Sequence, residues 1–370
     1  MQLFYNIKNI LINFINWLYL KGIFIHEIKN IIKKRSLWRS VILTDEQKQE
    51  IDLYWKKNYG KKIPHYWHRL YQSYTGKFDV KYFPEIIYST KIETKGCKLL
   101  QSEILSDKNL LDKTKFKTSE VIIPQTIANV VNGRWFINDA IVTKKEALNT
   151  IYNYKRKKVV GKISVESSSG RGVKFFDFES MSFEEFKLEI EKWNQRNVVF
   201  QECIEQHELF DKLNPSSVNT IRVITYIVND KICCAPVVMR IGRFGSKVDN
   251  AHAGGMFIGI DNDGLLEKEA YTEYGEKYDK HPDTGIVFEG YKIPFIANII
   301  KNAKKLHLSY QEMQFVSWDF TVDINENINL IEVNLVSQTI WMSQIANGKS
   351  FFEDNTEYMM KIANSKAGEL

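Results

Sequence analysis

Two carboxylates and an amide near the C-terminal end of the chain have the types and spacing of a divalent-metal site. Glu332 and Asn334 lie two residues apart in an apolar run, so on a strand both side chains would point to one face. Asp319 lies thirteen residues before Glu332, beyond a polar turn at 325–327, and would lie on the partner strand of a hairpin. Magnesium accepts such oxygen ligands, with nucleotide phosphates and water completing its shell. The same pattern, taken alone, also fits an exposed polar strand face.

A lysine followed by a loop of serines and glycines lies in the middle of the chain. Lys162 ends an apolar run that predicts a β-strand, and the loop 167–172 follows. Glycine lets backbone amides approach phosphate closely and lysine neutralises phosphate charge, so this stretch could bind a nucleotide. The lysine precedes the glycines, which excludes a Walker loop, and no GxGxxG motif is present. A flexible surface hairpin is the structural alternative.

A second apolar strand, 198–202, ends in the pair Gln201-Glu202. Backbone groups at such a strand end could hydrogen-bond adenine, and the Glu202 carboxylate could reach a ribose or an amino group. On its own this is an ordinary strand end.

The order of these elements resembles the ATP-grasp superfamily: a lysine, a glycine-rich loop, a strand with Gln-Glu, then Asp and Glu-x-Asn. Within it, the chain is similar to the sugar-transfer-associated ATP-grasp group found with polysaccharide biosynthesis. The phrases that carry this closer resemblance are Ser216–Val223, Val248–Gly255 and His281–Gly285. The superfamily resemblance spans roughly residues 100–345.

The resemblance implies ATP and Mg²⁺ as cofactors and assigns them ligands. The implied ATP-binding residues are Lys108, Lys162, Ser169, Gly170, Arg171, Gly172, Gln201, Glu202, Cys203 and Ile204. The implied metal ligands are Asp319, Glu332 and Asn334. Superfamily members have an earlier lysine in an Asp-Lys pair; Lys108 is preferred here, and Lys113 is the other candidate. Arg171 departs from the small or Lys residue common at its place.

Further polar residues are expected to line the cleft. Arg222 and Arg240 are the predicted catalytic residues, because a guanidinium stabilises charge during phosphoryl transfer. The predicted substrate-binding residues are Asn219, Asp249, Asn250, His252 and His281. A structural turn is the alternative for the Gly-rich stretch 249–255.

The reaction that the resemblance implies has two steps. A substrate carboxylate attacks the γ-phosphate to give an acyl phosphate and ADP, and an amine then displaces phosphate to leave an amide. The expected substrates are a sugar (uronic acid) carboxylate and an amino acid or amino alcohol, in capsule or surface polysaccharide biosynthesis. The alternatives are a phosphotransferase with the same clamp and a non-catalytic, membrane-associated scaffold of glycan assembly.

The expected fold class is α+β, with two α+β subdomains that clamp ATP between antiparallel sheets. The predicted division places a helical, basic, amphipathic extension at 1–80 and an N-terminal subdomain at 81–150. The small subdomain, with the glycine-rich loop and the adenine hinge, is expected at 151–205. The large subdomain, with the metal site, is expected at 206–370.

The net charge of +6 is concentrated at the N-terminal end of the sequence. Residues 1–40 contain seven basic side chains and one acid, Glu27, so the remaining residues are neutral overall. This distribution argues against a nucleic-acid binder, which would carry basic charge on the body of the fold. Residues 3–18 are expected to form an amphipathic helix. It either contacts a membrane surface together with the rest of residues 1–40, or packs with a second helix on the body of the protein.

Composition also indicates the compartment. The four cysteines show no CxxC pairing and no zinc spacing, which favours a reducing environment. The sequence has no signal-peptide pattern and no long uninterrupted apolar run. We therefore expect a cytoplasmic protein, peripheral at the inner membrane face if the N-terminal helices touch lipid.

Overall fold

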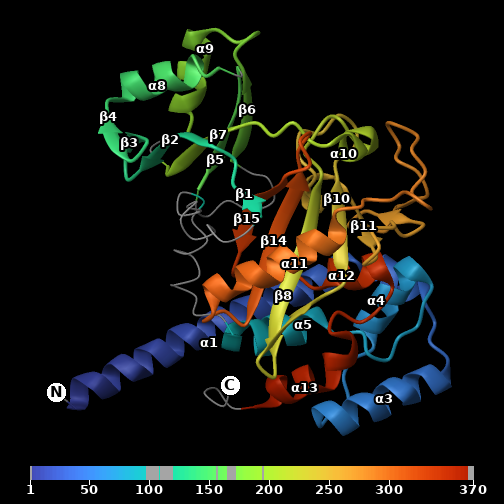
Figure 1. The fold of residues 1–370 in the computed structure, drawn as a ribbon. Coiled ribbons are helices and arrows are strands. Elements are labelled where there is room, and N and C mark those ends of the chain that lie inside the picture. Colours follow the sequence, from blue (N-terminus) through green and yellow to red (C-terminus); the bar gives the residue numbers. More distant parts are fainter. Residues whose placement is uncertain are drawn as a thin grey trace.

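The computed structural model describes residues 2–96, 108, 120–155, 157–164, 172–193 and 196–365, with side chains from residue 14 onward. Within these residues the chain forms two sheets, each covered by helices (Figure 1). This is the α+β architecture with two antiparallel sheets that the sequence predicts; the one parallel pairing is that of β1 with β15.

The smaller sheet has six antiparallel strands in the order β4-β3-β2-β7-β5-β6. Their bounds are β2 (Thr126–Val131), β3 (Arg134–Ile137), β4 (Ala140–Val142), β5 (Lys158–Ile163), β6 (Val173–Asp177) and β7 (Val198–Glu202). Helices α8 (Lys144–Tyr152) and α9 (Phe183–Glu191) cover it, and each begins with a capping box. Asn132 and Gly133 both have positive φ, which gives the primed turn between β2 and β3.

Residues 126–202 therefore form one unit. Strand β2 pairs with β7 through Asn129 and Val199, so both halves of this stretch share a sheet and a core. The boundary predicted at residue 150 falls inside this sheet and is corrected: the small subdomain begins near residue 126.

The larger sheet has the order β1-β15-β14-β8-β10-β11-β12-β13, with β9 paired to β8. The bounds are β1 (Val121–Ile122), β8 (Thr220–Val228), β9 (Lys231–Cys234), β10 (Val237–Ile241), β11 (Met256–Ile260), β12 (Ala270–Tyr271), β13 (Lys277–Tyr278), β14 (Phe315–Val322) and β15 (Ile328–Asn334). Helix α11 (Ile296–His307) and the neighbouring 3-10 turn η4 (Leu308–Tyr310) pack on the face that carries Ile221 and Trp318.

The opposite face of the larger sheet is covered by helices from both ends of the chain. They are α1 (Gln2–Lys33), α2 (Arg35–Ser40), α3 (Asp45–Tyr59), α4 (Tyr66–Thr75), α5 (Glu85–Ile87), η1 (Tyr88–Glu93), α6 (Thr94–Gly96), α12 (Trp341–Asn347), η5 (Glu353–Asn355) and α13 (Thr356–Asn364). Short helices α10 (Glu208–Leu213) and η3 (Ala251–Ala253) lie in loops. Trp55 of α3 is fully buried in one core with Tyr226 and Phe315. The helices predicted over residues 1–80 are therefore present, and all but the outer half of α1 pack against the larger sheet.

In the described parts of the chain two crossings connect the sheets, and they lie side by side. One crossing follows β1 and the other follows β7. The Gln125 carbonyl accepts a hydrogen bond from the Glu202 amide at 3.1 Å, and Gln201 Nε2 donates to the Pro124 carbonyl at 3.2 Å. We name these two stretches, 122–126 and 201–207, the double strap.

Two buried carboxylates brace the segment that follows β15. Glu85 accepts hydrogen bonds from the Ile340 amide at 3.1 and 3.2 Å, and Glu93 accepts one from the Gln338 amide at 2.6 Å. Both side chains are buried. Helical residues early in the chain thus fix the backbone at 338–341, directly after the predicted metal-binding strand.

Glu93 makes the stability of the fold depend on pH. Burial raises the pKa of Glu93 from 4.5 to about 8, despite the Gln338 amide, which lowers it. Between these values the unfolded chain releases a proton that the folded chain keeps, so the folded state loses stability as the pH rises. We expect the thermal midpoint to fall between about pH 5 and pH 8.5, and to fall less in Glu93→Gln. An unchanged pH dependence in Glu93→Gln, with exposed Glu50→Gln as the control, would contradict this.

Among the described residues, no helix combines the length and hydropathy needed to cross a membrane. Cys203, Cys233 and Cys234 are free thiols, and Cys97 lies outside the described residues.

Candidate active site

The hairpin of β14 and β15 brings the predicted metal ligands together. Asp319 lies directly opposite Glu332 in the register, and Asn334 lies opposite Ser317. A β-bulge after Asp319 shifts the register to Phe320 and Leu330. Asp319 is 1% exposed, whereas Glu332 and Asn334 are partly exposed. The hairpin predicted from the sequence therefore forms, and it places two carboxylates and one amide at adjacent positions of the sheet.

Arginines from neighbouring strands hold Asp319. Arg222 of β8 donates through Nε and a terminal nitrogen to the two Asp319 oxygens, at 2.8 Å each. Arg240 of β10 donates to the same carboxylate at 3.4 Å. Burial alone would raise the pKa of Asp319, but the charges of Arg222 and Arg240 outweigh it and leave this pKa lowered. Asp319 is therefore ionised at neutral pH.

Arg240 also links Asp319 to Asp249. Its guanidinium donates to the Asp249 oxygens at 2.9 and 3.3 Å and to Thr220 Oγ1 at 3.0 Å. The Thr220 hydroxyl donates in turn to Asp249. Burial would lower the pKa of Arg240, but Asp249 and Asp319 outweigh it and raise this pKa. One buried guanidinium therefore fixes the positions of two carboxylates.

Two lysines approach the carboxylates of Asp319 and Glu332 from the side of the smaller sheet. Lys108 Nζ lies 3.0 Å from Glu332 Oε1, and its backbone amide donates to the Ser164 carbonyl at the end of β5. Lys162, on β5, donates to Gln201 Oε1 at 3.1 Å. Lys108 thus joins the two sheets at the predicted metal site, and Lys162 lies beside the double strap.

Comparison with protein families gives a match over most of the chain. The family described as sugar-transfer associated ATP-grasp matches residues 90–358, which is more than half of the sequence. The chain belongs to this ATP-grasp family. The resemblance inferred from the sequence is therefore confirmed. A comparison with curated protein sequences found no match.

The similar solved structures are named synthetases and ligases. D-alanyl-alanine synthetase A from Vibrio cholerae O1 biovar eltor is 12% identical, with a TM-score of 0.41, over 70% of this chain and 66% of that one. D-alanine–D-alanine ligase from Bacillus anthracis is 14% identical, with a TM-score of 0.38, over 70% and 66%. N5-carboxyaminoimidazole synthetase from Staphylococcus aureus, complexed with ADP, is 10% identical, with a TM-score of 0.38, over 66% and 52%. The chain spans two thirds or less of the length of these three structures.

The residues of this ATP-grasp chain fit a magnesium site. Asp319, Glu332 and Asn334 offer two carboxylates and an amide oxygen, which is the donor set that magnesium takes alongside phosphate and water. Asn334 Nδ2 is buried without a hydrogen-bond partner among the described residues, so no strong contact fixes the amide in another orientation. No cluster of three His, Cys, Asp or Glu residues forms elsewhere in the described parts of the chain.

Most of the predicted phosphate loop lies outside the described residues: Ser169, Gly170 and Arg171. Gly172, at its end, has a φ of 82°, and its carbonyl accepts from the Ile163 amide at 2.8 Å. A Cβ at Gly172 would lie 2.5 Å from Ile163 Cδ1. Glycine is therefore required where β6 begins. Lys113 also lies outside the described residues, whereas the contacts of Lys108 support the preference for Lys108.

The predicted adenine-binding residues lie on the double strap. Glu202 ends β7, where its carboxylate accepts hydrogen bonds from the Gln125 amide at 3.4 Å and the Tyr154 hydroxyl at 3.0 Å. Cys203 and Ile204 follow on the crossing and are partly exposed. Burial raises the pKa of the Cys203 thiol to about 11, so this thiol is neutral. Both residues lie on the second crossing, and adenine binding there stays a prediction.

Two of the predicted substrate-binding residues, Asn219 and His281, use their side chains in hydrogen bonds within the fold. Asn219 is fully buried and donates through Nδ2 to the carbonyls of Phe210 and Asn214, at 2.8 and 2.9 Å. His281 is fully buried, and its Nε2 lies 2.8 Å from the Gly242 carbonyl. Their hydrogen-bonding groups are used within the fold, so we withdraw the prediction that these two side chains contact substrate.

The other three predicted substrate-binding residues, Asp249, Asn250 and His252, differ in how far their side chains are buried. Asp249 is buried against Arg240. Asn250 caps the 3-10 turn η3 by accepting from the His252 amide at 2.8 Å. His252 is exposed, and its Nδ1 lies 2.6 Å from Glu273, away from the metal-binding hairpin. These contacts favour the structural-turn alternative for the stretch 249–255, with Asp249 positioning Arg240.

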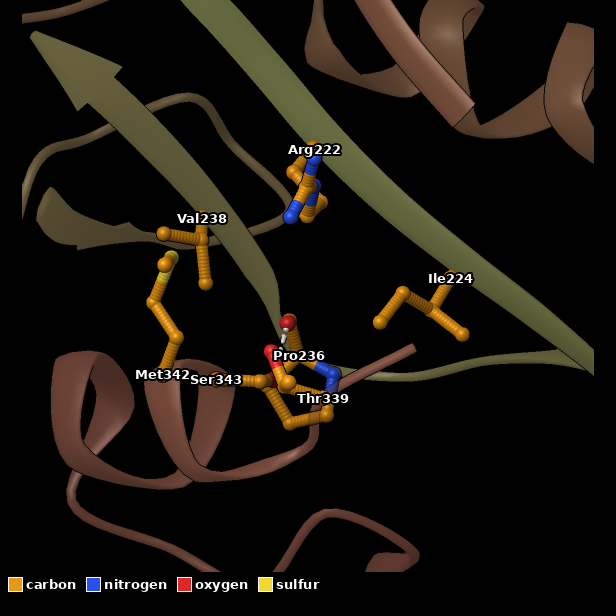
Figure 2. Close-up of a pocket in the computed structure, with 7 residues that line it drawn as sticks. All are labelled: Arg222, Ile224, Pro236, Val238, Thr339, Met342 and Ser343. Atoms are coloured by element: carbon orange, nitrogen blue, oxygen red, sulfur yellow. Dashed lines mark hydrogen bonds between the residues drawn. The ribbon is translucent and has the colours of Figure 1, made fainter. Parts of the chain in front are cut away.

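A small pocket lies beside Arg222 that the sequence did not reveal (Figure 2). Ile224 and Val238 supply apolar walls from β8 and β10. Thr339 and Met342 close it from the segment after β15 and from α12. The pocket therefore has mainly apolar walls with polar groups of Arg222, Thr339 and Ser343 at its edge, and it has room for about one water molecule. The guanidinium of Arg222 contacts both this pocket and Asp319.

The affinity for ATP is expected to depend on the protonation of Lys162. Burial, and then the charge of Lys108, lowers the pKa of Lys162 to about 8. Only the protonated amine attracts phosphate, so the KM for ATP should rise as the pH increases beyond about 8. Lys162→Arg keeps a permanent charge, so its KM for ATP should vary less with pH. A KM for ATP that stays constant to about pH 9.5 in the wild-type protein would contradict this role.

Proposed function

We propose that this protein is an ATP- and magnesium-dependent ligase that joins a carboxylate to an amine through an acyl phosphate. The observation that supports this most is the position of Asp319 opposite Glu332, with Lys108 paired to Glu332. Family membership supports the use of ATP, and the similar structures are named ligases and synthetases. Bound magnesium would neutralise charge on the transferred phosphoryl group.

The chain's own residues have separate tasks in this proposal. Lys162 and Lys108 would neutralise phosphate charge from the side of the smaller sheet, while Asp319, Glu332 and Asn334 would hold the metal from the larger sheet. Arg222 lies at the border between the metal site and the pocket, where a guanidinium can orient the carboxylate and stabilise charge as it attacks. Positioning of this kind supplies most of the catalysis of phosphoryl transfer, which needs little covalent help from the protein.

The pocket beside Arg222 is the proposed site of the amine substrate. It borders Arg222, which also contacts Asp319, so a molecule there would lie close to the carboxylate that is being activated. In this structure it has room for about one water molecule, so an amine would enter only after Thr339 or Met342 moved. The walls of Ile224 and Val238 would then contact the apolar part of a small amino acid or amino alcohol. An amine bound there could attack the acyl phosphate while both molecules remain bound to the protein.

Filling this pocket should affect one substrate and spare the other. Thr339 is partly exposed at the pocket wall, and Thr339→Leu would add apolar volume there. We expect the KM for the amine to rise about tenfold or more, with the KM for ATP unchanged. Thr150→Leu, at an exposed position of α8 beside the smaller sheet, is the matched control. Equal changes in both KM values would argue against an amine site here.

The carboxylate substrate is proposed to be a sugar uronic acid in capsule or surface polysaccharide biosynthesis. The support is the family description, sugar-transfer associated ATP-grasp. The free thiols among the described cysteines support a reducing compartment, so we propose a cytoplasmic setting.

The decisive experiment measures ADP and phosphate release from magnesium-ATP, with a panel of uronic-acid nucleotide sugars and amines, and analyses the products by mass spectrometry. Phosphate release that needs both substrates, with a product joined by loss of water, would support the ligase. Transfer of phosphate to a hydroxyl would replace it by the phosphotransferase. Absence of ATP binding would refute both enzymes and leave the scaffold.

A further inference from the structure

The outer half of helix α1 extends away from the body of the protein (Figure 1). Its side chains from residue 14 to residue 25 are exposed, apart from partly buried Ile23. Most of them are large and apolar: Phe14, Ile15, Trp17, Leu18, Tyr19, Leu20, Phe24 and Ile25. Phe14, Trp17 and Phe24 are 50–55% exposed. An apolar surface of this extent on a projecting helix indicates a contact with something other than the protein's own body.

The inner half of α1 is held firmly, so the direction of the outer half is defined. Ile31 is buried, and its carbonyl accepts a hydrogen bond from Trp38 Nε1 at 3.0 Å. Lys34, just after the helix, lies over the ring of Trp341, 4.0 Å from its centroid, and 3.8 Å from Glu273. A 32-residue helix is about 48 Å long at 1.5 Å per residue, so the outer half reaches well beyond these contacts.

The exposed charges near this apolar surface are all positive. From residue 14 to residue 40 the only acid is Glu27, and it is buried. The exposed basic residues of the same stretch are Lys21, Lys29, Lys33, Arg35 and Arg39. Packing of two such helices side by side would bring like charges together, whereas an anionic surface would attract them. Charge complementarity therefore favours a negatively charged partner over a second copy of the chain.

Aromatic residues on the helix match the boundary between lipid and water. Trp17 and Tyr19 combine an apolar ring with a polar group, a combination that prefers the interfacial region of membranes. Lys21 Nζ lies 4.8 Å from the centroid of the Trp17 ring, so its stem covers apolar surface while its charge remains available.

We propose that the outer half of α1 binds the surface of a membrane containing anionic lipid, with Phe14, Trp17 and Phe24 inserted between head groups and the basic residues near the lipid phosphates. The helix lies on the membrane and does not cross it, in agreement with its hydropathy. This contact requires neither ATP nor the ligase reaction, so it stands independently of the proposed function.

The test uses the full-length protein and two kinds of vesicle, phosphatidylcholine alone and phosphatidylcholine with phosphatidylglycerol. The protein should sediment with the vesicles that contain phosphatidylglycerol, and high salt should weaken the binding. The variant Phe14→Ser/Trp17→Ser/Phe24→Ser should lose at least tenfold in apparent affinity. Lys21→Glu/Lys29→Glu should lose about fivefold or more per lysine.

The matched control is Leu53→Ser/Ile141→Ser/Leu188→Ser, which removes three exposed apolar side chains elsewhere on the protein. It should bind vesicles within about twofold of the wild type, because these side chains lie away from α1. Lack of binding to vesicles with phosphatidylglycerol would overturn the proposal, as would full binding by the α1 variant. A dimer in solution that the α1 variant abolishes, without any vesicle binding, would assign the helix to self-association instead.

Discussion

Glu332→Gln is expected to reduce kcat by about 10²- to 10³-fold, the size of effect seen when one charge-stabilising group is removed from an active site. Glutamine has nearly the same shape as glutamate but no negative charge, so it binds a divalent cation poorly. It also ends the 3.0 Å ion pair with Lys108, which joins the two sheets at this position. The side chain is 28% exposed, so the fold should tolerate the change. The measurement is ADP release at saturating magnesium-ATP.

The matched control is Glu326→Gln, the same substitution in the exposed turn of the same hairpin. It should leave kcat within about twofold of the wild type, because surface changes away from a site have small effects. Wild-type turnover by Glu332→Gln would remove Glu332 from the metal site and leave the ligase proposal without its main support.

Arg240→Met is expected to destabilise the folded protein by about 3–5 kcal/mol, the typical cost of removing one partner from a buried ion pair. Arg240 is 7% exposed and lies between Asp249 and Asp319, both of which are also buried. Methionine fills much of the same volume but leaves Asp249 without its main cationic partner. The measurement is the free energy of unfolding in urea, compared with that of the wild type.

A second substitution separates charge from packing. Asp249→Asn in the Arg240→Met background removes the carboxylate that lost its cationic partner, since Asp319 keeps its two hydrogen bonds from Arg222. It should therefore restore part of the lost free energy of unfolding. Arg134→Met, at an exposed position of β3, is the control and should change this free energy by less than about 0.5 kcal/mol. Equal losses in both arginine variants would contradict the role assigned to Arg240.

The part of the site that the sequence predicts best is the part built from neighbouring residues. Alternation of apolar and polar residues on both sides of a short turn specifies β14 and β15, and the register then places Asp319 opposite Glu332. Lys162 and Gln201 lie on strands with similarly clear patterns, and their contact follows from the pairing of β5 with β7.

Features that depend on long-range packing could not be predicted. The pocket combines Pro236, Thr339 and Met342 with residues of β8, and nothing in the local sequence of any of them marks a binding site. Glu85 and Glu93 look like ordinary helix-surface acids in sequence, yet they are buried because the backbone at 338–341 offers them amide donors. The helical extension that the sequence predicts is present, but its packing could not be predicted, since α3 shares a core with Tyr226 and Phe315, more than 150 residues further along the chain.

The sequence led us to predict substrate contacts for two polar residues whose side chains bond within the fold. The sequence around His281 and Asn219 contains the polar and glycine residues that often occur in binding loops. In the structure these side chains satisfy the buried carbonyls of Gly242 and Phe210. A buried polar group must find a hydrogen-bond partner, and this need alone accounts for both residues.

We infer that the double strap limits how the two sheets move relative to each other once the ion pair of Lys108 with Glu332 has opened. The two stretches of the double strap are hydrogen-bonded to each other at Gln125 and Glu202, so they resist sliding and twisting of one sheet against the other. The easiest remaining motion is a rotation of the smaller sheet about the line along which the two stretches run. Displacement in such a motion grows with distance from the line. Strand β6, at one edge of the smaller sheet, would move further than β5 or β7, whereas Cys203 and Ile204 on the double strap would hardly move. If the proposed nucleotide site is correct, opening would expose the phosphates of ADP while the base is still held, so ADP would leave with its phosphates first.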